Sequence, residues 1–227
     1  MRGVFVTGTD TGVGKTVVAA AMCAALRGRG ERVVAWKPVV TGVEEAGDPD
    51  HELLARASGT QPSAVAPFTF APAVSPHLAA ELAGSAIEPT ELVASARAAA
   101  DGAEILVIEG VGGLLVPLTL GFLVRDLARE VGLPLVIAAR PGLGTINHTL
   151  LTVEAARAVG LRVVGVVLTP WPEDPSVMER SNRDTIERLA GVEVSTLPWL
   201  PRADPELLAG AGAGLPLAAW FAGRDGD

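Results

Sequence analysis

Short apolar runs alternate along the chain with longer segments of helical pattern. The apolar runs predict strands at residues 3–7, 32–36, 105–109, 135–139, 163–168 and 192–197. The segments between them predict helices at residues 15–27, 50–57, 76–83, 89–100, 122–130, 145–159 and 175–189. Several strands are apolar almost throughout, which is typical of a sheet that helices cover on both faces. The pattern therefore predicts an α/β fold with a mostly parallel sheet.

Glycine and proline mark the breaks in this pattern. Glycines stand just past the predicted helix ends, where the chain needs a residue that tolerates a positive φ: Gly28, Gly30, Gly84, Gly102, Gly132 and Gly160. The Pro- and Ala-rich stretch 61–76 is expected to be a connection, and residues 222–227 a frayed tail. No repeat or linker divides the 227 residues, so a single domain over residues 1–227 is expected.

Composition excludes several classes of function. At 49% hydrophobic residues the chain can bury a large core and is not disordered. No apolar run reaches the roughly 18 residues of a membrane span and no signal peptide is recognisable, so a cytoplasmic protein is expected. The single cysteine, Cys23, excludes a disulfide framework. The net charge of −8 disfavours nucleic acid as a partner, because phosphate neutralisation needs a basic surface.

The basic residues are used unevenly. Of the 18 lysines and arginines, only Lys15 and Lys37 are lysines. A lysine carries a compact ammonium with three rotatable donors, which a planar guanidinium does not replace. Both positions are therefore candidates for a role that needs an ammonium.

Lys15 lies in the glycine-rich segment TGTDTGVGKT, residues 7–16, between the first predicted strand and the first predicted helix. This context is typical of a phosphate-binding loop, in which backbone N–H groups and a helix N-terminus hold phosphate oxygens. There Lys15 reaches the β- and γ-phosphates, and the hydroxyl of Thr16 holds Mg²⁺. Five residues separate Gly8 from Gly14, one more than usual. The alternative is a glycine-rich turn in an ordinary strand–helix unit.

Lys37 directly follows the second predicted strand. The carboxyl ends of parallel strands are where ligands bind in such sheets. Thr41 and Gly42 behind it resemble a second, small anion-binding turn. The alternative for Lys37 is an ordinary solvated charge at a strand end.

Two carboxylates are candidate metal ligands. Glu109 ends the buried run ILVIE and precedes a glycine-rich segment, and a carboxylate at this position holds Mg²⁺ in P-loop enzymes. The alternative for Glu109 is a helix cap at the strand end. Asp50 is the candidate second carboxylate, with Asp48 as its neighbour, and the alternative for Asp50 is the N-cap of the following helix.

Taken together, these motifs resemble the dethiobiotin synthetase family of P-loop NTPases. The segments that carry the resemblance are TGTDTGVGKT at 7–16, KPVVTG at 37–42, SPH at 75–77, EGVGG at 109–113, GTINH at 144–148 and PWL at 198–200. The resemblance covers about residues 3–201. It implies an ATP- and Mg²⁺-dependent ligase that closes the ureido ring of dethiobiotin from 7,8-diaminopelargonic acid and CO2. The implied path runs through a carbamate and a carbamic–phosphoric anhydride, with release of ADP and phosphate.

The resemblance also implies roles for individual residues. Lys15 and Lys37 are the expected catalytic residues, and Thr16, Asp50 and Glu109 the expected metal ligands. The nucleotide is expected at Gly12, Val13, Gly14, Lys15, Thr16, Val17, Asp50, Glu109, Gly110, Val111, Gly112, Thr169, Pro170, Pro198, Trp199 and Leu200. The substrate is expected at Thr11, Lys37, Thr41, Gly112, Gly113 and Leu114 of one subunit and Gly144, Thr145 and Asn147 of the other. The implied assembly is a homodimer with the substrate near the interface.

Two positions depart from the family pattern. Gly12 stands where some members carry an acidic residue. Thr169-Pro170 stands where many relatives carry an Asn that reads the adenine edge. Hydrogen-bonded readout is what rejects a wrong base, so nucleoside triphosphates other than ATP are expected to be accepted as well.

Two other classes of protein share parts of this pattern. A nucleotide-switched, partition-type ATPase that acts as a binding protein is the alternative, but such proteins usually carry an additional early lysine where this loop has Thr9-Asp10. The amidotransferase-type synthetases need a glutaminase domain with a nucleophilic cysteine. The only cysteine here, Cys23, precedes any such domain.

Overall fold

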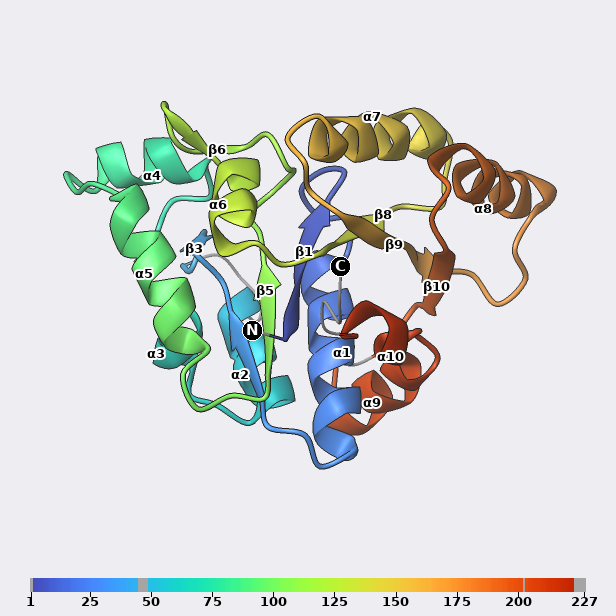
Figure 1. Ribbon diagram of the computed structural model, residues 1–227, viewed down its shortest axis with the longest axis horizontal. Coiled ribbons are helices and arrows are strands. Elements are labelled where there is room, and N and C mark those ends of the chain that lie inside the picture. The colour runs from blue at the N-terminus through green and yellow to red at the C-terminus, as the bar shows by residue number, and fades with distance from the viewer. Residues whose placement is uncertain (1, 45–48, 202, 223–227) are drawn as a thin grey trace.

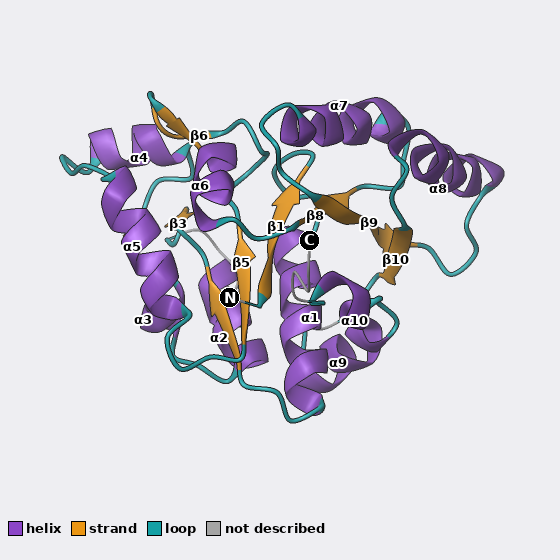
Figure 2. Cartoon of the chain, viewed as in Figure 1, coloured by secondary structure: helices purple, strands orange, loops and turns teal. Residues whose placement is uncertain are grey.

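Six parallel strands form the central sheet of the computed structural model (Figures 1 and 2), which describes residues 2–44, 49–201 and 203–222. The strands are β1 (Gly3–Gly8), β2 (Val33–Trp36), β5 (Ile105–Glu109), β8 (Leu135–Ala139), β9 (Val163–Trp171) and β10 (Val194–Pro198). Their order is β10-β9-β8-β1-β5-β2. All neighbouring pairs are parallel, so the carboxyl ends of β1, β2 and β5 lie at one edge. The predicted α/β fold is confirmed.

Helices cover both faces of this sheet. One apolar core contains residues of α1 (Lys15–Gly28), α2 (Asp50–Ser58), α3 (Pro62–Val65), α9 (Pro205–Ala213) and α10 (Leu217–Trp220). The other contains residues of α4 (Pro76–Leu82), α5 (Pro89–Ala99), α6 (Val124–Val131), α7 (Thr145–Arg157) and α8 (Val177–Ala190). Side chains of a strand alternate between the faces, so Val4 and Val6 enter the first core and Phe5 the second. This two-sided burial explains why the strands are apolar throughout.

The C-terminal helices pack closely against the first core. A Cβ at Gly212 of α9 would lie 2.1 Å from the carbonyl oxygen of Ala21 in α1, so only glycine permits this approach. A Cβ at Gly165 of β9 would lie 2.6 Å from the ring of Trp220. Figure 1 shows α9 beside α1, the helix that carries Lys15. The C-terminal segment thus packs against the helix that follows the phosphate loop.

The helix-ending glycines largely follow the prediction. Gly30, Gly84, Gly102, Gly132 and Gly160 have φ between 62° and 84°. Gly28, by contrast, is the last residue of α1 and has no positive φ.

Several short elements correct the predictions from sequence. Phe122 and Leu123 form β7 (Phe122–Leu123), antiparallel to β6 (Pro117–Thr119), so the predicted helix start at 122 is wrong. The helix begins at Val124 because the N–H of Leu123 is held by the carboxylate of Asp126 at 2.9 Å.

The predicted connection 61–76 contains α3 and β4 (Phe68–Phe70), and β4 pairs with β3 (Val39–Thr41). Of the expected tail, residues 223–227 lie outside the described residues. Among the helices of the described part, none is long and apolar enough to cross a membrane.

Candidate active site

The segment from Gly8 to Gly14 connects β1 to α1 as a glycine-dependent loop. Gly14 has φ 92° and directly precedes α1, and a Cβ there would lie 2.6 Å from the methyl group of Thr169. Gly12 has φ 68°. No side chain among the described residues caps the N-terminus of α1. The first N–H groups of α1 are therefore available to an anion, as a phosphate loop requires.

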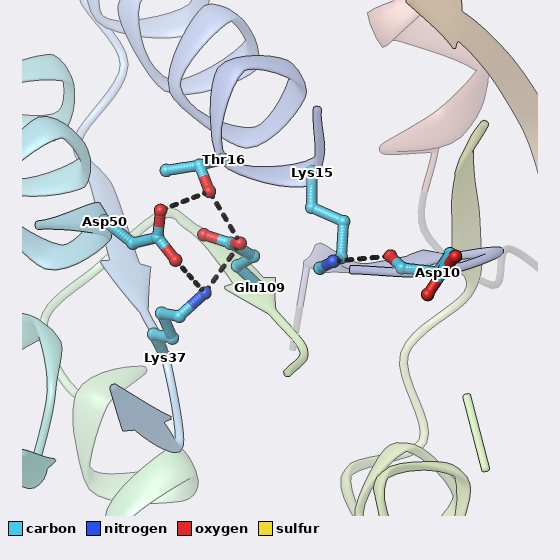
Figure 3. Close-up of polar contacts among 6 residues, drawn as sticks. All are labelled: Asp10, Lys15, Thr16, Lys37, Asp50 and Glu109. Carbon is cyan, nitrogen blue, oxygen red and sulfur yellow. Dashed lines mark hydrogen bonds and ion pairs between the residues drawn. The ribbon is translucent and has the colours of Figure 1, made fainter. Parts of the chain in front are cut away.

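Lys15 is buried beside this loop. Its Nζ donates a hydrogen bond to the carbonyl oxygen of Asp10 at 3.0 Å (Figure 3). Burial holds the pKa of Lys15 below 10.5, with Glu109 opposing this effect and Lys37 adding to it. A phosphate oxygen can replace the neutral carbonyl as the acceptor for this ammonium, because charge-assisted hydrogen bonds are stronger.

Lys37 and Glu109 face each other because of the strand register. Trp36 of β2 pairs with Ile108 of β5, so the next residues of the two strands, Lys37 and Glu109, are neighbours. Their Nζ and Oε1 atoms are 2.7 Å apart, and the side chains are 3% and 0% exposed. The interpretation of Lys37 as a solvated strand end is therefore wrong, as is that of Glu109 as a helix cap.

Asp50 and Thr16 complete the network that Figure 3 shows. Asp50 is the first residue of α2, and its Oδ2 lies 2.8 Å from Nζ of Lys37. The hydroxyl of Thr16 lies 2.8 Å from Oδ1 of Asp50 and 2.9 Å from Oε1 of Glu109. Asp50 makes no N-cap hydrogen bond, so the N-cap alternative is wrong. Asp48 lies outside the described residues.

Burial and charge act against each other in this network. Burial alone would lower the pKa of Lys37, but Glu109 and Asp50 outweigh burial and hold that pKa above 10.5. Burial raises the pKa of Glu109 above 4.5, although Lys37 opposes the rise. Burial also acts to raise the pKa of Asp50, but Lys37 and Thr16 hold it below 3.8. Oε2 of Glu109 is buried and has no hydrogen-bond partner among the described residues.

These groups open into one cavity of about 550 Å³. The predicted site residues that line it are Thr11, Gly12, Gly14, Lys15, Thr16, Lys37, Thr41, Asp50, Glu109, Val111 and Gly112. Its remaining lining residues are Val39, Ala73, Val74, Ser75, Pro76 and Val116, which were not predicted as site residues. The SPH motif at 75–77 is the sequence feature that could have predicted this part of the cavity lining. The structure thus brings both lysines, the phosphate loop and the carboxylates together.

Other predicted site residues lie outside the cavity lining. Val13 is buried in the first core and Val17 packs against it. Leu114 is buried in the second core, so only its backbone is available to a ligand. Gly110 and Gly113 do not line the cavity but flank residues that do.

The turn after Thr41 differs from the prediction. Thr41 ends strand β3 and lines the cavity. The N–H of Gly42 donates to the carbonyl of Pro72 at 3.2 Å, and the N–H of Val43 donates to the carbonyl of Phe70 at 3.3 Å. These amides are already bonded, so the anion-binding turn is not present.

The expected base-binding residues gather at the ends of two adjacent strands. Thr169 and Pro170 belong to β9, and Pro198 ends β10 and pairs with Trp171. Leu200 and Trp199 follow, and the side chain of Trp199 is 67% exposed. Thr169 is buried against Gly14, so this region adjoins the phosphate loop.

The residues expected to act from a second subunit lie at the start of α7. Gly144, with φ 91°, directly precedes α7, Thr145 is buried and Asn147 is exposed. None of the three lines the cavity of its own chain. Leu143 beside them is 93% exposed.

One contact to the loop carried no sequence signal. Arg140, which follows β8, donates a hydrogen bond from Nη2 to the carbonyl oxygen of Thr11 at 3.1 Å. Arginine is the common basic residue in this chain, so residue type alone does not distinguish position 140.

A central strand that runs through a Gly-Lys-Thr loop into a helix, with a carboxylate at the neighbouring strand end, defines a P-loop NTPase. A model of the AAA-domain family matches residues 2–206. "ATP-dependent dethiobiotin synthetase BioD" of Anaeromyxobacter dehalogenans strain 2CP-C is 48% identical over 88% of this chain and 92% of its own length. The protein of the same name from Bacillus subtilis strain 168 is 38% identical over 86% of this chain and 85% of its own. The chain belongs to the dethiobiotin synthetase family, and it is an ATP-dependent ligase.

A solved structure confirms the fold. The ParA family ATPase from Chlorobium tepidum TLS superimposes with a TM-score of 0.57 over 96% of this chain and 92% of that chain. The sequence identity is 16%, so the likeness concerns the fold alone.

Proposed function

We propose that this ligase closes the ureido ring of dethiobiotin in the cytoplasm, from 7,8-diaminopelargonic acid, CO2 or bicarbonate as its source, and ATP. The observation that carries the proposal is the placement of both lysines of the chain in one cavity with Thr16, Asp50 and Glu109. Every species on the proposed path is anionic, and two ammonium groups in a buried site stabilise such species.

Lys37 is suited to hold the carbamate. Addition of CO2 to one amine of the substrate forms an N–C bond and releases a proton, which leaves a carbamate whose single negative charge is shared by two oxygens. The ammonium of Lys37 has three N–H donors, and Glu109 and Asp50 engage two of them. The third N–H can therefore bind a carbamate oxygen. Thr41 and Thr11, which line the same cavity, are proposed to hold the diamine end.

Lys15 is suited to the phosphoryl transfer. A carbamate oxygen attacks the γ-phosphorus, the bond to ADP breaks, and a carbamic–phosphoric anhydride forms. Lys15 leaves the carbonyl of Asp10 and neutralises charge on the β- and γ-phosphates. The second amine then attacks the carbonyl carbon, phosphate leaves with the bonding electron pair, and the ring closes with loss of a proton.

The oxygen atoms near Thr16 fit a magnesium ion. Mg²⁺ prefers hard oxygen ligands and is usually held by one or two carboxylates together with substrate phosphates. Thr16, Asp50 and Glu109 would hold the ion, and the unpartnered, buried Oε2 of Glu109 offers a further lone pair. The ion would neutralise phosphate charge.

The nucleoside is proposed to lie beyond the phosphate loop, near the ends of β9 and β10. Thr169 adjoins Gly14 of the loop, so a nucleoside in this region would lie next to phosphates bound at the loop. Pro198, Trp199 and Leu200 would contact the base through their backbone and apolar surfaces. Because the amide of an Asn is missing at Thr169-Pro170, CTP and GTP are proposed as further substrates beside ATP.

A homodimer is proposed to complete the substrate site. Gly144, Thr145 and Asn147 lie at the N-terminal end of α7, a position that favours a carboxylate. In Figure 1 the strand β6 and the helix α7 both lie along the upper edge of the molecule. Four leucines in or next to these segments are exposed: Leu143 at 93%, Leu120 at 88%, Leu151 at 56% and Leu115 at 52%. Such an apolar rim supports burial against a second subunit.

The decisive experiment incubates the purified protein with the diamine, bicarbonate, MgCl2 and ATP. We expect dethiobiotin by mass spectrometry and one phosphate released per product. Hydrolysis of ATP that is unaffected by the diamine, without dethiobiotin, would refute the ligase and favour the nucleotide-switched binding protein.

In the same assay Lys37→Arg is expected to lower the rate about a hundredfold or more, the typical cost of losing a charge-stabilising donor. Turnover near that of the wild type would exclude a special role for the ammonium.

A further inference from the structure

Arg140 connects the end of β8 to the lengthened part of the phosphate loop. Its Nη2 donates a hydrogen bond to the carbonyl oxygen of Thr11 at 3.1 Å. We propose that Arg140 is a positioning residue that keeps the Asp10–Gly12 segment in its binding shape while Lys15 is engaged with phosphate. The proposal deepens the proposed function and rests on it only for the movement of Lys15 to phosphate.

Two consecutive carbonyl groups of the loop are each held by a cation. The carbonyl of Asp10 accepts from Nζ of Lys15 at 3.0 Å, and the carbonyl of Thr11 accepts from Arg140. When the ammonium of Lys15 moves to a phosphate oxygen, the Asp10 carbonyl loses that donor. The bond from Arg140 does not depend on phosphate, so it remains when Lys15 has moved.

Backbone hydrogen bonds fix the ends of the loop, whereas in the described residues its middle is bonded to more distant groups only through the side chains of Lys15 and Arg140. The N–H of Thr9 donates to the carbonyl of Ala138 at 3.1 Å, and the N–H of Val18 donates to the carbonyl of Gly14 at 3.0 Å. Between these two bonds, the N–H of Thr11 donates to the carboxylate of the preceding residue, Asp10, at 2.7 Å. This local bond turns the segment but does not attach it to the body of the protein. The Arg140 bond makes that attachment, across 129 positions of sequence.

Hydrogen bonds hold the backbone that follows Arg140. Asn182 of α8 is 7% exposed, and its Nδ2 donates to the carbonyls of Pro141 at 3.0 Å and Gly142 at 3.3 Å. The N–H of Thr145 also donates to the carbonyl of Gly142, at 3.2 Å. A positioning group is accurate only if its own support is fixed, and these bonds fix the backbone directly after Arg140.

The guanidinium also lies close to the substrate side of the loop. An ideal Cβ on Gly12 would lie 3.9 Å from Nη2 of Arg140, and both Thr11 and Gly12 line the active-site cavity. Because Arg140 is itself exposed, its side chain adds little buried surface to the fold. Removal of the side chain should therefore change ligand binding and turnover much more than stability.

The test compares Arg140→Ala and Arg140→Lys with the wild type. A hydrogen bond to a charged group corresponds to about a tenfold to hundredfold effect, so kcat/KM of Arg140→Ala should fall by that factor. The dissociation constant of a fluorescent ATP analogue should rise about tenfold, since the phosphate cradle loses its shape. Arg140→Lys should recover part of both losses, and millimolar ethylguanidinium should partly restore Arg140→Ala. The melting temperature of each variant should stay within about 2 °C of the wild type.

Arg157→Ala is the matched control. Arg157 also donates from a guanidinium to a backbone carbonyl, that of Ala190 at 2.7 Å, but it lies at the C-terminal end of α7. Its kinetic constants should equal those of the wild type. The proposal is overturned if Arg140→Ala binds the analogue and turns over normally. It is also overturned if the melting temperature falls by more than about 5 °C while the kinetic constants of the surviving protein are unchanged. Analogue binding is measured without the diamine, so a failure of the ligase assignment and a failure of this proposal are distinguishable.

Discussion

The buried pair of Lys37 and Glu109 predicts a large, pH-dependent loss of stability in Lys37→Met. Methionine keeps the length and apolar character of the lysine stem, so the substitution removes the charge and leaves little empty space. Glu109 is 0% exposed, and its Oε2 already lacks a partner among the described residues. Without Lys37, Thr16 is the only described residue that donates a hydrogen bond to this carboxylate, and Lys15 acts on it only as a more distant charge.

The size of the loss follows from the burial of Glu109. Removal of one partner from a buried ion pair costs about 3–5 kcal/mol, because the other charge stays uncompensated. For a chain of this length that corresponds to a fall in melting temperature of about 6–20 °C. Asp50 contributes little to this loss, since its side chain is 45% exposed and can turn to water.

The loss should be larger at alkaline than at acid pH. Burial raises the pKa of Glu109 above 4.5, and Lys37→Met removes the main effect that lowers it. A carboxyl group with a raised pKa binds its proton more tightly in the folded state than in the unfolded state. The free energy of unfolding of the variant therefore falls as the pH rises from 4.5 through the folded pKa. In the wild type, the raised pKa of Lys37 gives a contribution that is complete below pH 10.5 and is lost only above it.

The assay is urea unfolding at pH 5 and pH 8. Lys37→Met/Glu109→Gln should recover more than half of the loss at pH 8, because it removes the uncompensated charge. Arg32→Met is the control, since Arg32 and Glu104 form a 3.4 Å pair whose side chains are 72% and 46% exposed. Exposed pairs of this kind contribute roughly 0–1 kcal/mol. A Lys37→Met protein within about 1 kcal/mol of the wild type at pH 8, or a double variant no more stable than the single one, refutes the reasoning.

Three further predictions concern base selectivity, packing and assembly. With no amide to read the base, kcat/KM for ATP, CTP and GTP should agree within about tenfold, and a preference for ATP of a thousandfold or more contradicts the base-site assignment. Gly212→Ala should destabilise the protein by about 1–3 kcal/mol, since its Cβ would meet the carbonyl of Ala21 at 2.1 Å; Gly214→Ala, whose nearest contact is 3.6 Å, is the control. Equal amounts of the inactive variants Lys15→Ala and Asn147→Asp, mixed under conditions that exchange subunits, should regain about a quarter of wild-type turnover, and no recovery despite exchange argues against a shared site.

The long elements were predictable because their burial is regular. The strands β1, β5 and β8 are buried at every position, and most of the main sheet therefore appears in the sequence as apolar runs; β10, with the sequence VSTLP, is only partly buried. The strands β3, β4, β6 and β7 have two or three residues each, too few for any periodicity. The helix α9 has the sequence PELLAGAGA, in which glycine lowers the helix propensity. Its stability comes from close contact with α1 through Gly212, and this contact is visible only in three dimensions.

The centre of the site was predictable for a different reason. A parallel sheet brings the carboxyl ends of its strands to one edge, so Lys15, Lys37 and Glu109 had to converge once the strands were known. Local sequence did not predict Arg140, because its partner Thr11 is 129 positions away and arginine is common in this chain. Leu114 was expected near the substrate from its neighbours in sequence. The turn between β5 and β6 instead places its side chain in the core.

The shape of the Lys37 pocket explains why a chain so rich in arginine keeps a lysine there. Glu109 and Asp50 approach the ammonium at 2.7 and 2.8 Å from two different elements, β5 and α2. A tetrahedral ammonium can satisfy both carboxylates and direct its third N–H into the cavity. The planar fork of a guanidinium suits two oxygens of one carboxylate and is bulkier in a site that leaves Lys37 only 3% exposed. The geometry of the acceptors, more than the need for positive charge, therefore selects lysine at position 37.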